Sequence, residues 1–221
     1  MCGKFTQLAS WQEVHAFSQP LVVGTAVEAV VSTPMRFAKI MRLNAASERE
    51  LAPMRWGFAG RHDSSPSRPR HMHARAETID ELPTFRQSFA ECRGILMVHT
   101  FNEGEELPSG KTKQWVIEPK DGQPIAIAVI FETWHNGEEL MDTFVQVTTP
   151  ANALISRITD RMPAILPRAV WPLWLGETEA SPADIKAVLR VFEDEGMWTM
   201  TEQSPARTAK TRRPSPQQTL F

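Results

Sequence analysis

Short apolar runs, separated by polar or turn-forming segments, recur along most of the chain and are rich in β-branched residues. Such runs are typical of strands. The predicted strands cover residues 21–23, 29–31, 54–58, 94–98, 114–118, 125–131 and 144–148. Asp121-Gly122 separates two of these runs and predicts a tight hairpin between them.

Other segments predict helices, at residues 10–18, 82–90, 150–156, 167–175 and 182–195. Ser181 is a favourable N-cap for the last of them, and Pro182 suits its first turn. The strands do not alternate regularly with the helices. The pattern therefore predicts an α+β fold, with one domain over residues 1–202 that is built on a curved, barrel-like, mostly antiparallel sheet with peripheral helices.

The composition changes at Gln203, where Pro, Ser, Thr, Gln and basic residues replace apolar ones. This predicts a disordered basic tail over residues 203–221. The tail ends in Gln217-Gln218-Thr219-Leu220-Phe221, which resembles the Gln-x-x-Leu-Phe peptide that docks bacterial replication and repair proteins on the sliding clamp. Leu220 and Phe221 would fill an apolar pocket and Gln217 would supply hydrogen bonds, whereas an inert terminus is the alternative.

The overall charge is nearly balanced, since 24 basic and 26 acidic side chains give a net charge of −2. A uniformly basic nucleic-acid-binding coat is therefore excluded, and any DNA contact has to come from local charge. Residues 61–75 form a basic loop that offers such charge, and Asp63 is its only acid. Its arginines are Arg61, Arg68, Arg70 and Arg75. We interpret the loop as a phosphate-contacting funnel, the alternative being a solvated loop without a ligand.

Cysteine usage and hydropathy bear on location. The chain has two cysteines, Cys2 and Cys92, which are too few for a disulfide scaffold. No leader precedes Cys2, and no apolar run approaches the roughly 18 residues that a membrane span needs. We expect a reducing cytoplasmic location, associated with the nucleoid when DNA is bound, and no membrane contact.

A metal site is a weaker hypothesis. His71 and His73 would project from one face if they lay on a strand, and Cys2 could join them as a ligand. No Cys-x-x-Cys or His-Glu-x-x-His accompanies them. No metal or other cofactor is therefore expected.

Cys2 becomes the N-terminal residue if Met1 is removed, and it then offers an α-amine and a thiol on adjacent carbons. The reference pKa of an α-amine is about 8, so a useful fraction is neutral and nucleophilic near neutral pH. An aldehyde can form a Schiff base with that amine, and the thiol can then close a thiazolidine ring. Many proteins begin Met-Cys by chance, so this pair alone does not identify a function.

Several sequence blocks accompany Cys2 in a fixed order. They are Cys2-Gly3-Lys4-Phe5, Met54-Arg55-Trp56-Gly57-Phe58, His73-Ala74-Arg75-Ala76-Glu77-Thr78, Phe85-Arg86 with Arg93-Gly94-Ile95-Leu96, Phe101-Asn102-Glu103, Phe144-Val145-Gln146-Val147-Thr148-Thr149-Pro150-Ala151-Asn152 and Asp160-Arg161-Met162-Pro163-Ala164-Ile165-Leu166. From Cys2 to about Leu175 the chain resembles the SRAP family, the SOS response-associated proteins that cross-link to abasic sites in single-stranded DNA. The resemblance implies a single SRAP-like domain, abasic single-stranded DNA as partner, and an activity of lyase or peptidase type.

The resemblance also implies roles for individual residues. Cys2 matches the family nucleophile, and Glu103 matches the carboxylate that moves protons during ring opening and closure. From the residues alone, Glu103 could equally be an ordinary surface acid.

Further matches concern DNA. Arg75 and Arg161 match arginines that hold phosphates, while Lys4 and Thr148 match backbone-contacting positions. A buried pair with Asp160 is the alternative for Arg161.

Two departures bear on catalysis. His73 stands where the family has asparagine, and Thr159 stands where it has histidine. Threonine cannot titrate, whereas imidazole titrates near pH 6.5, so one hypothesis is that His73 assumes part of the missing role. The other is that catalysis is weakened or lost.

Three function classes follow. The first is an abasic-site sensor that forms a covalent thiazolidine through Cys2. The second is a catalytically degenerate SRAP domain that binds single-stranded or damaged DNA without a covalent bond. The third is a metal- or aldehyde-reactive protein unrelated to DNA.

Overall fold

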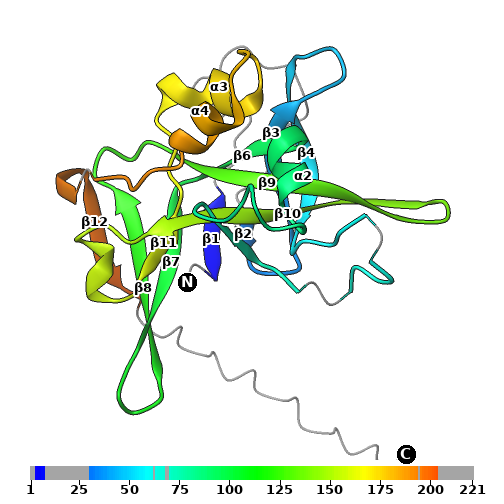
Figure 1. The fold of residues 1–221 in the computed structure, drawn as a ribbon. Coiled ribbons are helices and arrows are strands. Elements are labelled where there is room, and N and C mark those ends of the chain that lie inside the picture. The colour runs from blue at the N-terminus through cyan, green and yellow to red at the C-terminus, as the bar shows by residue number, and fades with distance from the viewer. Residues whose placement is uncertain (1–2, 8–29, 62, 68–69, 194, 204–221) are drawn as a thin grey trace, which may run out of the picture.

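Two sheets form the body of the protein in the computed structural model, which describes residues 3–7, 30–61, 63–67, 70–193 and 195–203 (Figure 1). The strands of the first sheet pair antiparallel throughout. Their order is β12 (Trp198–Glu202), β8 (Thr112–Pro119), β7 (Thr100–Glu106), β1 (Lys4–Gln7) and β2 (Val30–Ser32).

The second sheet closes on itself. Its order is β11 (Arg161–Pro163), β10 (Glu139–Pro150), β4 (Arg49–Trp56), β3 (Phe37–Leu43), β6 (Arg93–Val98) and β9 (Ile125–Asn136), and β5 (His73–Arg75) pairs with β10. Because β9 pairs with both β6 and β10, the sheet curves into a barrel. The pairings of β10 with β4 and β5 are parallel, and the others are antiparallel.

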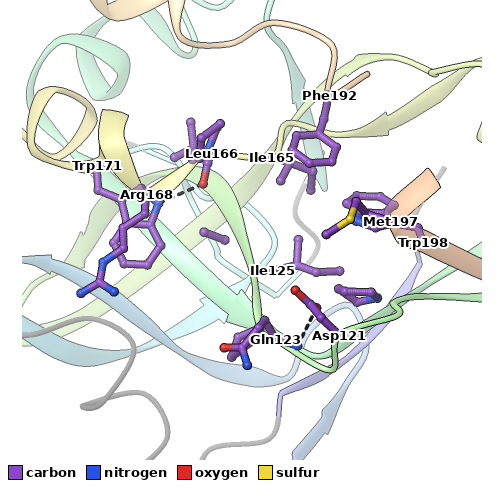
Figure 2. A pocket seen from close by; sticks show the side chains of 14 residues that line it. Asp121, Gln123, Ile125, Ile165, Leu166, Arg168, Trp171, Phe192, Met197 and Trp198 are labelled. Atoms are coloured by element: carbon purple, nitrogen blue, oxygen red, sulfur yellow. Dashed lines mark hydrogen bonds between the residues drawn. The ribbon is translucent and has the colours of Figure 1, made fainter. Parts of the chain in front are cut away.

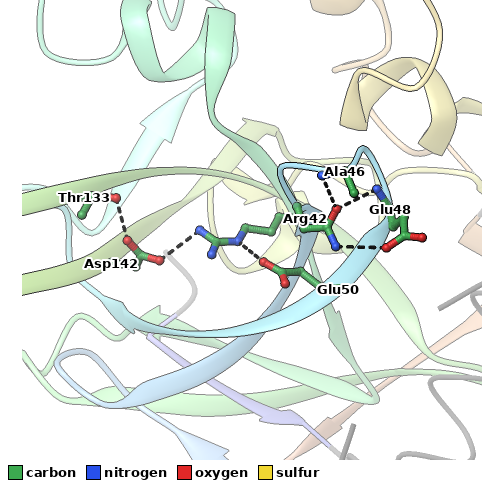
Figure 3. Close-up of polar contacts among 7 residues, drawn as sticks. Arg42, Ala46, Glu48, Glu50, Thr133 and Asp142 are labelled. Atoms are coloured by element: carbon green, nitrogen blue, oxygen red, sulfur yellow. Dashed lines mark hydrogen bonds and ion pairs between the residues drawn. The ribbon is translucent and has the colours of Figure 1, made fainter. Parts of the chain in front are cut away.

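A chain of ion pairs and one hydrogen bond ties four strands of this sheet together (Figure 3). Arg42 of β3 donates to Glu50 of β4 at 2.8 Å and to Asp142 of β10 at 3.0 Å. Thr133 of β9 donates to the other oxygen of Asp142 at 2.7 Å. Since the four residues are partly exposed, we assign the chain a modest structural role.

The helices lie on one face of the second sheet (Figure 1). They are α2 (Arg86–Glu91), α3 (Trp171–Leu175) and α4 (Pro182–Ala187), with the 3-10 turn η2 (Arg168–Val170) next to α3. The 3-10 turns η1 (Ile155–Arg157) and η3 (Glu195–Met197) lie elsewhere, since Ile155 and Trp198, which follows η3, belong to the other buried cluster. Phe89, Trp171 and Trp174 of the helices pack on Val145 and Val147 of β10 in one buried cluster. We call this side the helical face.

The opposite face of β10 looks toward the first sheet. Phe144 of β10 and Trp56 of β4 belong to a second buried cluster together with Phe5 of β1 and Phe101 of β7. Trp56 lies 5.1 Å from Phe5 and 6.4 Å from Phe144 between ring centroids. We call this side the inter-sheet face.

The α+β fold class with a curved, barrel-like, mostly antiparallel sheet is confirmed. Within the described residues, the predicted strands at 94–98, 114–118, 125–131 and 144–148 are confirmed, and each extends further than its apolar run, β6 by a single residue. Strands β1, β3, β5, β7, β11 and β12 were not predicted. The segments 10–18 and 21–23 lie outside the described residues.

The hairpin predicted at Asp121-Gly122 is wrong, because β8 and β9 belong to different sheets. The residue pair instead turns the chain from one sheet to the other. The paired hairpin is β9–β10, which turns at Asn136-Gly137 with Gly137 at φ +61°. Asparagine-glycine favours such a turn because glycine adopts positive φ without steric strain.

Three helix predictions need correction. The helix predicted at 82–90 is α2, which begins only at Arg86, because residues 82–85 form turns. Pro150 belongs to β10, and only η1 at Ile155–Arg157 is helical in the 150–156 region. Helix α4 ends at Ala187 instead of continuing to 195. Its predicted N-cap is confirmed, since Ser181 Oγ accepts the Asp184 N–H at 3.2 Å and the Asp184 carboxylate accepts the Ser181 N–H at 3.3 Å. None of the helices in the described ranges is long and apolar enough to span a membrane.

Candidate functional site

Glu103 lies deep on the inter-sheet face. It follows Phe101 by two positions on β7, so the two side chains project from the same face of the strand. Both residues are fully buried. Glu103 is therefore not an ordinary surface acid. A carboxylate is placed so deep only where it has an interaction partner or a chemical role, because burial of charge is costly.

The start of the described chain lies beside Glu103. Strand β1 begins at Lys4, and Lys4 pairs in register with Asn102 on β7, the neighbour of Glu103. Lys4 is half-buried. Cys2 lies outside the described residues, two positions before Lys4.

His73 begins β5 at the same face. Its imidazole meets the indole of Trp56 edge-on, with ring centroids 5.9 Å apart and planes at 83°. The Trp56 indole N–H donates to the Met72 carbonyl at 3.0 Å, which fixes the ring that His73 contacts. His73 is half-buried and stands directly opposite Gln146 of β10 in the parallel register.

Gln146 is a site residue that the sequence did not predict. It lies between Phe144 and Thr148 on the inter-sheet face of β10, and it is fully buried. Neither its amide nitrogen nor its amide oxygen has a hydrogen-bond partner. Its alternation with two valines in a predicted strand was the signal that could have identified it. Val145 and Val147 pack on the helical face, so Gln146 between them faces the other way.

Arg161 is the centre of a tightly bonded cluster at the edge of this face. Its guanidinium forms a fork with the Glu77 carboxylate, one arm of which measures 2.9 Å. The same group donates to the Thr148 carbonyl at 2.7 Å and to Thr148 Oγ1 at 3.1 Å. The alternative pair with Asp160 is wrong, because the bonded carboxylate is that of Glu77. We call these three residues the arginine cluster.

The arginine cluster changes the pKa of its carboxyl group, Glu77. The hydrogen bond from Arg161 lowers the pKa of the Glu77 carboxyl below its ordinary value, and the charges of Arg161 and Arg75 act in the same direction. Arg161 and Thr148 are buried, so neither is displayed to solvent like a surface phosphate contact. Their positions suit a cluster that shapes the edge of the site.

Arg75 and Thr159 lie near the same edge. Arg75 ends β5, is exposed, and is paired in register with Thr148. Within the described ranges Arg75 makes no ion pair, so its guanidinium is available to a phosphate. Thr159 is half-buried in the turn after η1, where its N–H donates to the Ile155 carbonyl at 3.1 Å. It precedes Arg161 by two positions.

The basic loop is less uniformly basic than its sequence indicated. A pocket of about 340 Å³ includes Arg61 and Arg70 in its lining, together with the acids Asp63 and Glu132. Arg61 pairs with the buried Glu132 at 3.2 Å, so its charge is partly neutralised. Arg68 lies outside the described residues. The phosphate-contacting role of Arg68 and Arg70 therefore stays a prediction.

The histidine pair does not share one face. His71 contacts Phe85 on the helical side, with ring centroids 5.1 Å apart, whereas His73 contacts Trp56 on the inter-sheet side. The expectation that both rings project together is wrong, because His71 lies before β5 and pairs separately with Phe58. In the part of the chain that the structure describes, no group of three metal-binding side chains occurs.

Two other features lie away from the site. Burial raises the pKa of the Cys92 thiol to about 11, so Cys92 is a poor nucleophile near neutral pH. An apolar pocket of about 180 Å³ lies between Ile125, Ile165, Phe192 and Trp198 (Figure 2). Neither includes Glu103 or His73.

The fold is a barrel-like α+β domain, and a buried carboxylate lies next to its first strand. Both features are those expected of an SRAP-like domain, and comparison with known proteins supports this class. The chain matches the family described as SOS response associated peptidase (SRAP) over residues 1–204. The protein therefore belongs to the SRAP family.

Curated relatives include abasic site processing proteins. The chain is 26% identical over 219 residues to YoqW of Bacillus subtilis (strain 168), covering 97% of each chain. It is 28% identical over 203 residues to YoaM of the same organism, covering 89% of this chain and 88% of the relative. HMCES of Xenopus tropicalis is 27% identical over 144 residues, which are 55% of this chain and 43% of the relative.

Solved structures share the fold. A Bordetella bronchiseptica protein superposes with a TM-score of 0.76 at 21% identity, covering 92% of this chain and 100% of the other. A second protein of the same organism, described as phage-related, gives a TM-score of 0.74 at 21% identity, covering 92% of this chain and 95% of the other.

Proposed function

We propose that this protein senses abasic sites in single-stranded DNA and captures them covalently as a thiazolidine on Cys2. The observation that supports it most is the fully buried Glu103 on β7, whose neighbour Asn102 pairs with Lys4, two residues after Cys2. Two residues of chain span at most about 7 Å, which limits how far the Cys2 amine can lie from the position of Lys4. The curated relatives named abasic site processing proteins support the same substrate.

The chemistry needs no cofactor. Once Met1 is removed, the Cys2 amine adds to the C1′ aldehyde of the ring-opened sugar, and loss of one water gives a Schiff base. The thiolate sulfur then adds to the imine carbon while the nitrogen gains a proton, which closes the thiazolidine ring. The net reaction joins protein and DNA and releases one water molecule. Glu103 takes the proton from the attacking amine and returns it to the leaving oxygen.

The experiment uses protein without Met1 and a single-stranded oligonucleotide that carries one abasic site. We expect a band that resists denaturation, and an intact mass equal to protein plus oligonucleotide minus one water. Cys2→Ser and Cys2→Ala should both abolish the band, because neither side chain has the thiol that forms the thiazolidine, and the imine or oxazolidine that could form hydrolyses readily. An oligonucleotide with a tetrahydrofuran site, which has no aldehyde, is the matched control and should give none.

Non-covalent recognition is the second candidate. It is favoured by Thr159, which cannot titrate, and by Arg161, whose guanidinium fork already holds Glu77. In that case the abasic oligonucleotide would shift in a native gel but leave no band after denaturation. Absence of both signals would point to aldehyde chemistry unrelated to DNA.

A variant of His73 distinguishes the two hypotheses about the family histidine that Thr159 replaces. Either His73 has assumed part of its catalytic role, or catalysis is weakened or lost. If the imidazole has assumed part of that role, His73→Ala should lower the cross-link yield. An unchanged yield in this variant would exclude compensation.

The C-terminal peptide supports a further partner. Gln217, Leu220 and Phe221 lie outside the described residues and match the Gln-x-x-Leu-Phe pattern of clamp-binding peptides. We expect that deletion of Leu220 and Phe221 abolishes capture on an immobilised bacterial sliding clamp, whereas cross-linking is unaffected. Retained capture by the truncated protein would exclude this partner.

A further inference from the structure

The buried amide of Gln146 has no structural task that the fold reveals. Gln146 is fully buried, and neither its Nε2 nor its Oε1 has a hydrogen-bond partner. Buried polar groups are nearly always hydrogen-bonded, and an amide that lacks both bonds destabilises the folded state. An apolar side chain of similar size would be the more stable choice. The amide is therefore expected to serve something other than stability.

Its position relates it to the proposed site. Phe144, Gln146 and Thr148 project from the inter-sheet face of β10, because Val145 and Val147 pack on the helical face. His73 stands directly opposite Gln146 on β5, and Val129 of the inter-sheet cluster stands opposite on β9. The amide thus lies between the candidate residue His73 and the Thr148 end of the arginine cluster.

Its chemistry is complementary to a sugar. An amide both donates and accepts hydrogen bonds, and a hydroxyl group does the same. The ring-opened abasic sugar presents a hydroxyl group near the aldehyde. An undamaged nucleotide has its base and a closed ring at that place. A site with a hydrogen-bonding group for a hydroxyl discriminates strongly against a ligand that lacks one, because the group in the site then stays unpaired.

We propose that Gln146 is a specificity-determining residue, whose amide hydrogen-bonds a hydroxyl group of the ring-opened abasic sugar while Cys2 reacts with its aldehyde. This inference rests on the proposed function and deepens it.

The first test pairs stability with reactivity. Gln146→Leu keeps the size and removes the amide, so its melting temperature should equal or exceed that of the wild type. Its rate of cross-linking to abasic single-stranded DNA should fall about tenfold, the effect of one buried hydrogen bond. Thiazolidine formation with acetaldehyde, which has no hydroxyl group, should stay within about twofold of wild type and shows that Cys2 is intact.

Thr149→Val is the matched control. Thr149 is on the same strand, is buried, and also has an unpartnered side-chain oxygen, but it projects from the opposite face. We expect it to cross-link at the wild-type rate. If Gln146→Leu also reacts with abasic DNA at the wild-type rate, or if both variants slow equally, Gln146 has no special role and the inference is overturned.

A second test separates this inference from the covalent reaction. A borohydride-reduced abasic site keeps the hydroxyl group of the open sugar, carries an alcohol in place of the aldehyde and cannot cross-link, whereas a tetrahydrofuran site has neither hydroxyl nor aldehyde. Wild type should bind the reduced site more tightly than the tetrahydrofuran site, and Gln146→Leu should erase that preference. If wild type forms no cross-link but shows this preference, the covalent proposal fails and the role of Gln146 stands. If wild type shows no preference, the role of Gln146 is excluded.

Discussion

The two faces of strand β10 are buried to a similar extent but differ in chemistry. On the helical face, Val145 and Val147 meet Trp171 and Trp174, and each indole N–H of these tryptophans donates to a backbone carbonyl, at 2.9 Å and 2.8 Å. On the inter-sheet face, Gln146 lies between Phe144 and Thr148, opposite Val129 on β9, with its amide unpartnered. The first face is composed for stability. The second retains buried polar groups that stability alone does not explain, and such groups concentrate where a protein binds or reacts.

Among the substitutions considered, the largest effect on the free energy of unfolding is expected on the helical face. Trp174→Ala removes a fully buried ring and its bond to the Gly94 carbonyl. We expect a loss of about 3–5 kcal/mol in the free energy of unfolding, measured by denaturant titration. Cross-linking per folded molecule should not change. Leu173→Ala, at a half-buried neighbour, should cost less. A large loss of activity in folded Trp174→Ala protein would show that the two faces are not separable.

The next effect is expected on the inter-sheet face. Glu103→Gln keeps the shape of the side chain and removes its proton-transfer capacity. Cross-linking should slow by about 100-fold or more, the usual range for a general acid–base group. Single-turnover kinetics at several pH values would measure it. Glu106→Gln, on an exposed residue of the same strand, should react normally. Normal rates in both variants would contradict a role for Glu103.

The arginine cluster should produce a smaller and pH-dependent effect. Because Arg161 lowers the pKa of Glu77 in the folded state, the pair stabilises the protein above the unfolded pKa near 4.5, and that contribution is lost as pH falls through the folded value. Glu77→Gln should cost roughly 1 kcal/mol at neutral pH, since the carboxylate is partly exposed, and progressively less as the pH falls below 4.5.

Thermal melts across this pH range would measure the effect. Glu81→Gln, an exposed acid nearby, is the control and should melt like wild type at every pH. A destabilisation by Glu77→Gln that is the same at neutral and acid pH would contradict the assigned ion pair.

The smallest effect is expected at the exposed edge. Arg75→Ala removes one cationic contact, so binding to single-stranded DNA should weaken a few-fold, and the dependence of the logarithm of affinity on the logarithm of salt should decrease by about 1. Arg86→Ala is the matched control, because Arg86 is exposed on α2 at the helical face. Equal effects in both variants would argue against a defined DNA path beside the site.

The local elements and the family could be predicted from the order of the amino acids alone. Alternating or continuous apolar runs give strands such as β6, and Ser181 with Asp184 caps α4, because both depend on residues close together in the chain. The sequence blocks around Cys2, Arg75, Glu103 and Arg161 were also sufficient for the resemblance to the SRAP family, which the comparison confirmed.

Contacts between distant residues became known only from the three-dimensional arrangement of the chain. Arg161 bonds Glu77, 84 positions away, instead of its neighbour Asp160. Asp121-Gly122 joins two sheets instead of closing a hairpin, and Gln146 becomes a buried site residue because β10 is covered on both faces. The physical reason is the same in each case. Local propensity is set by adjacent residues, whereas strand pairing, burial and ion-pair partners depend on which distant segments the closing sheet brings together.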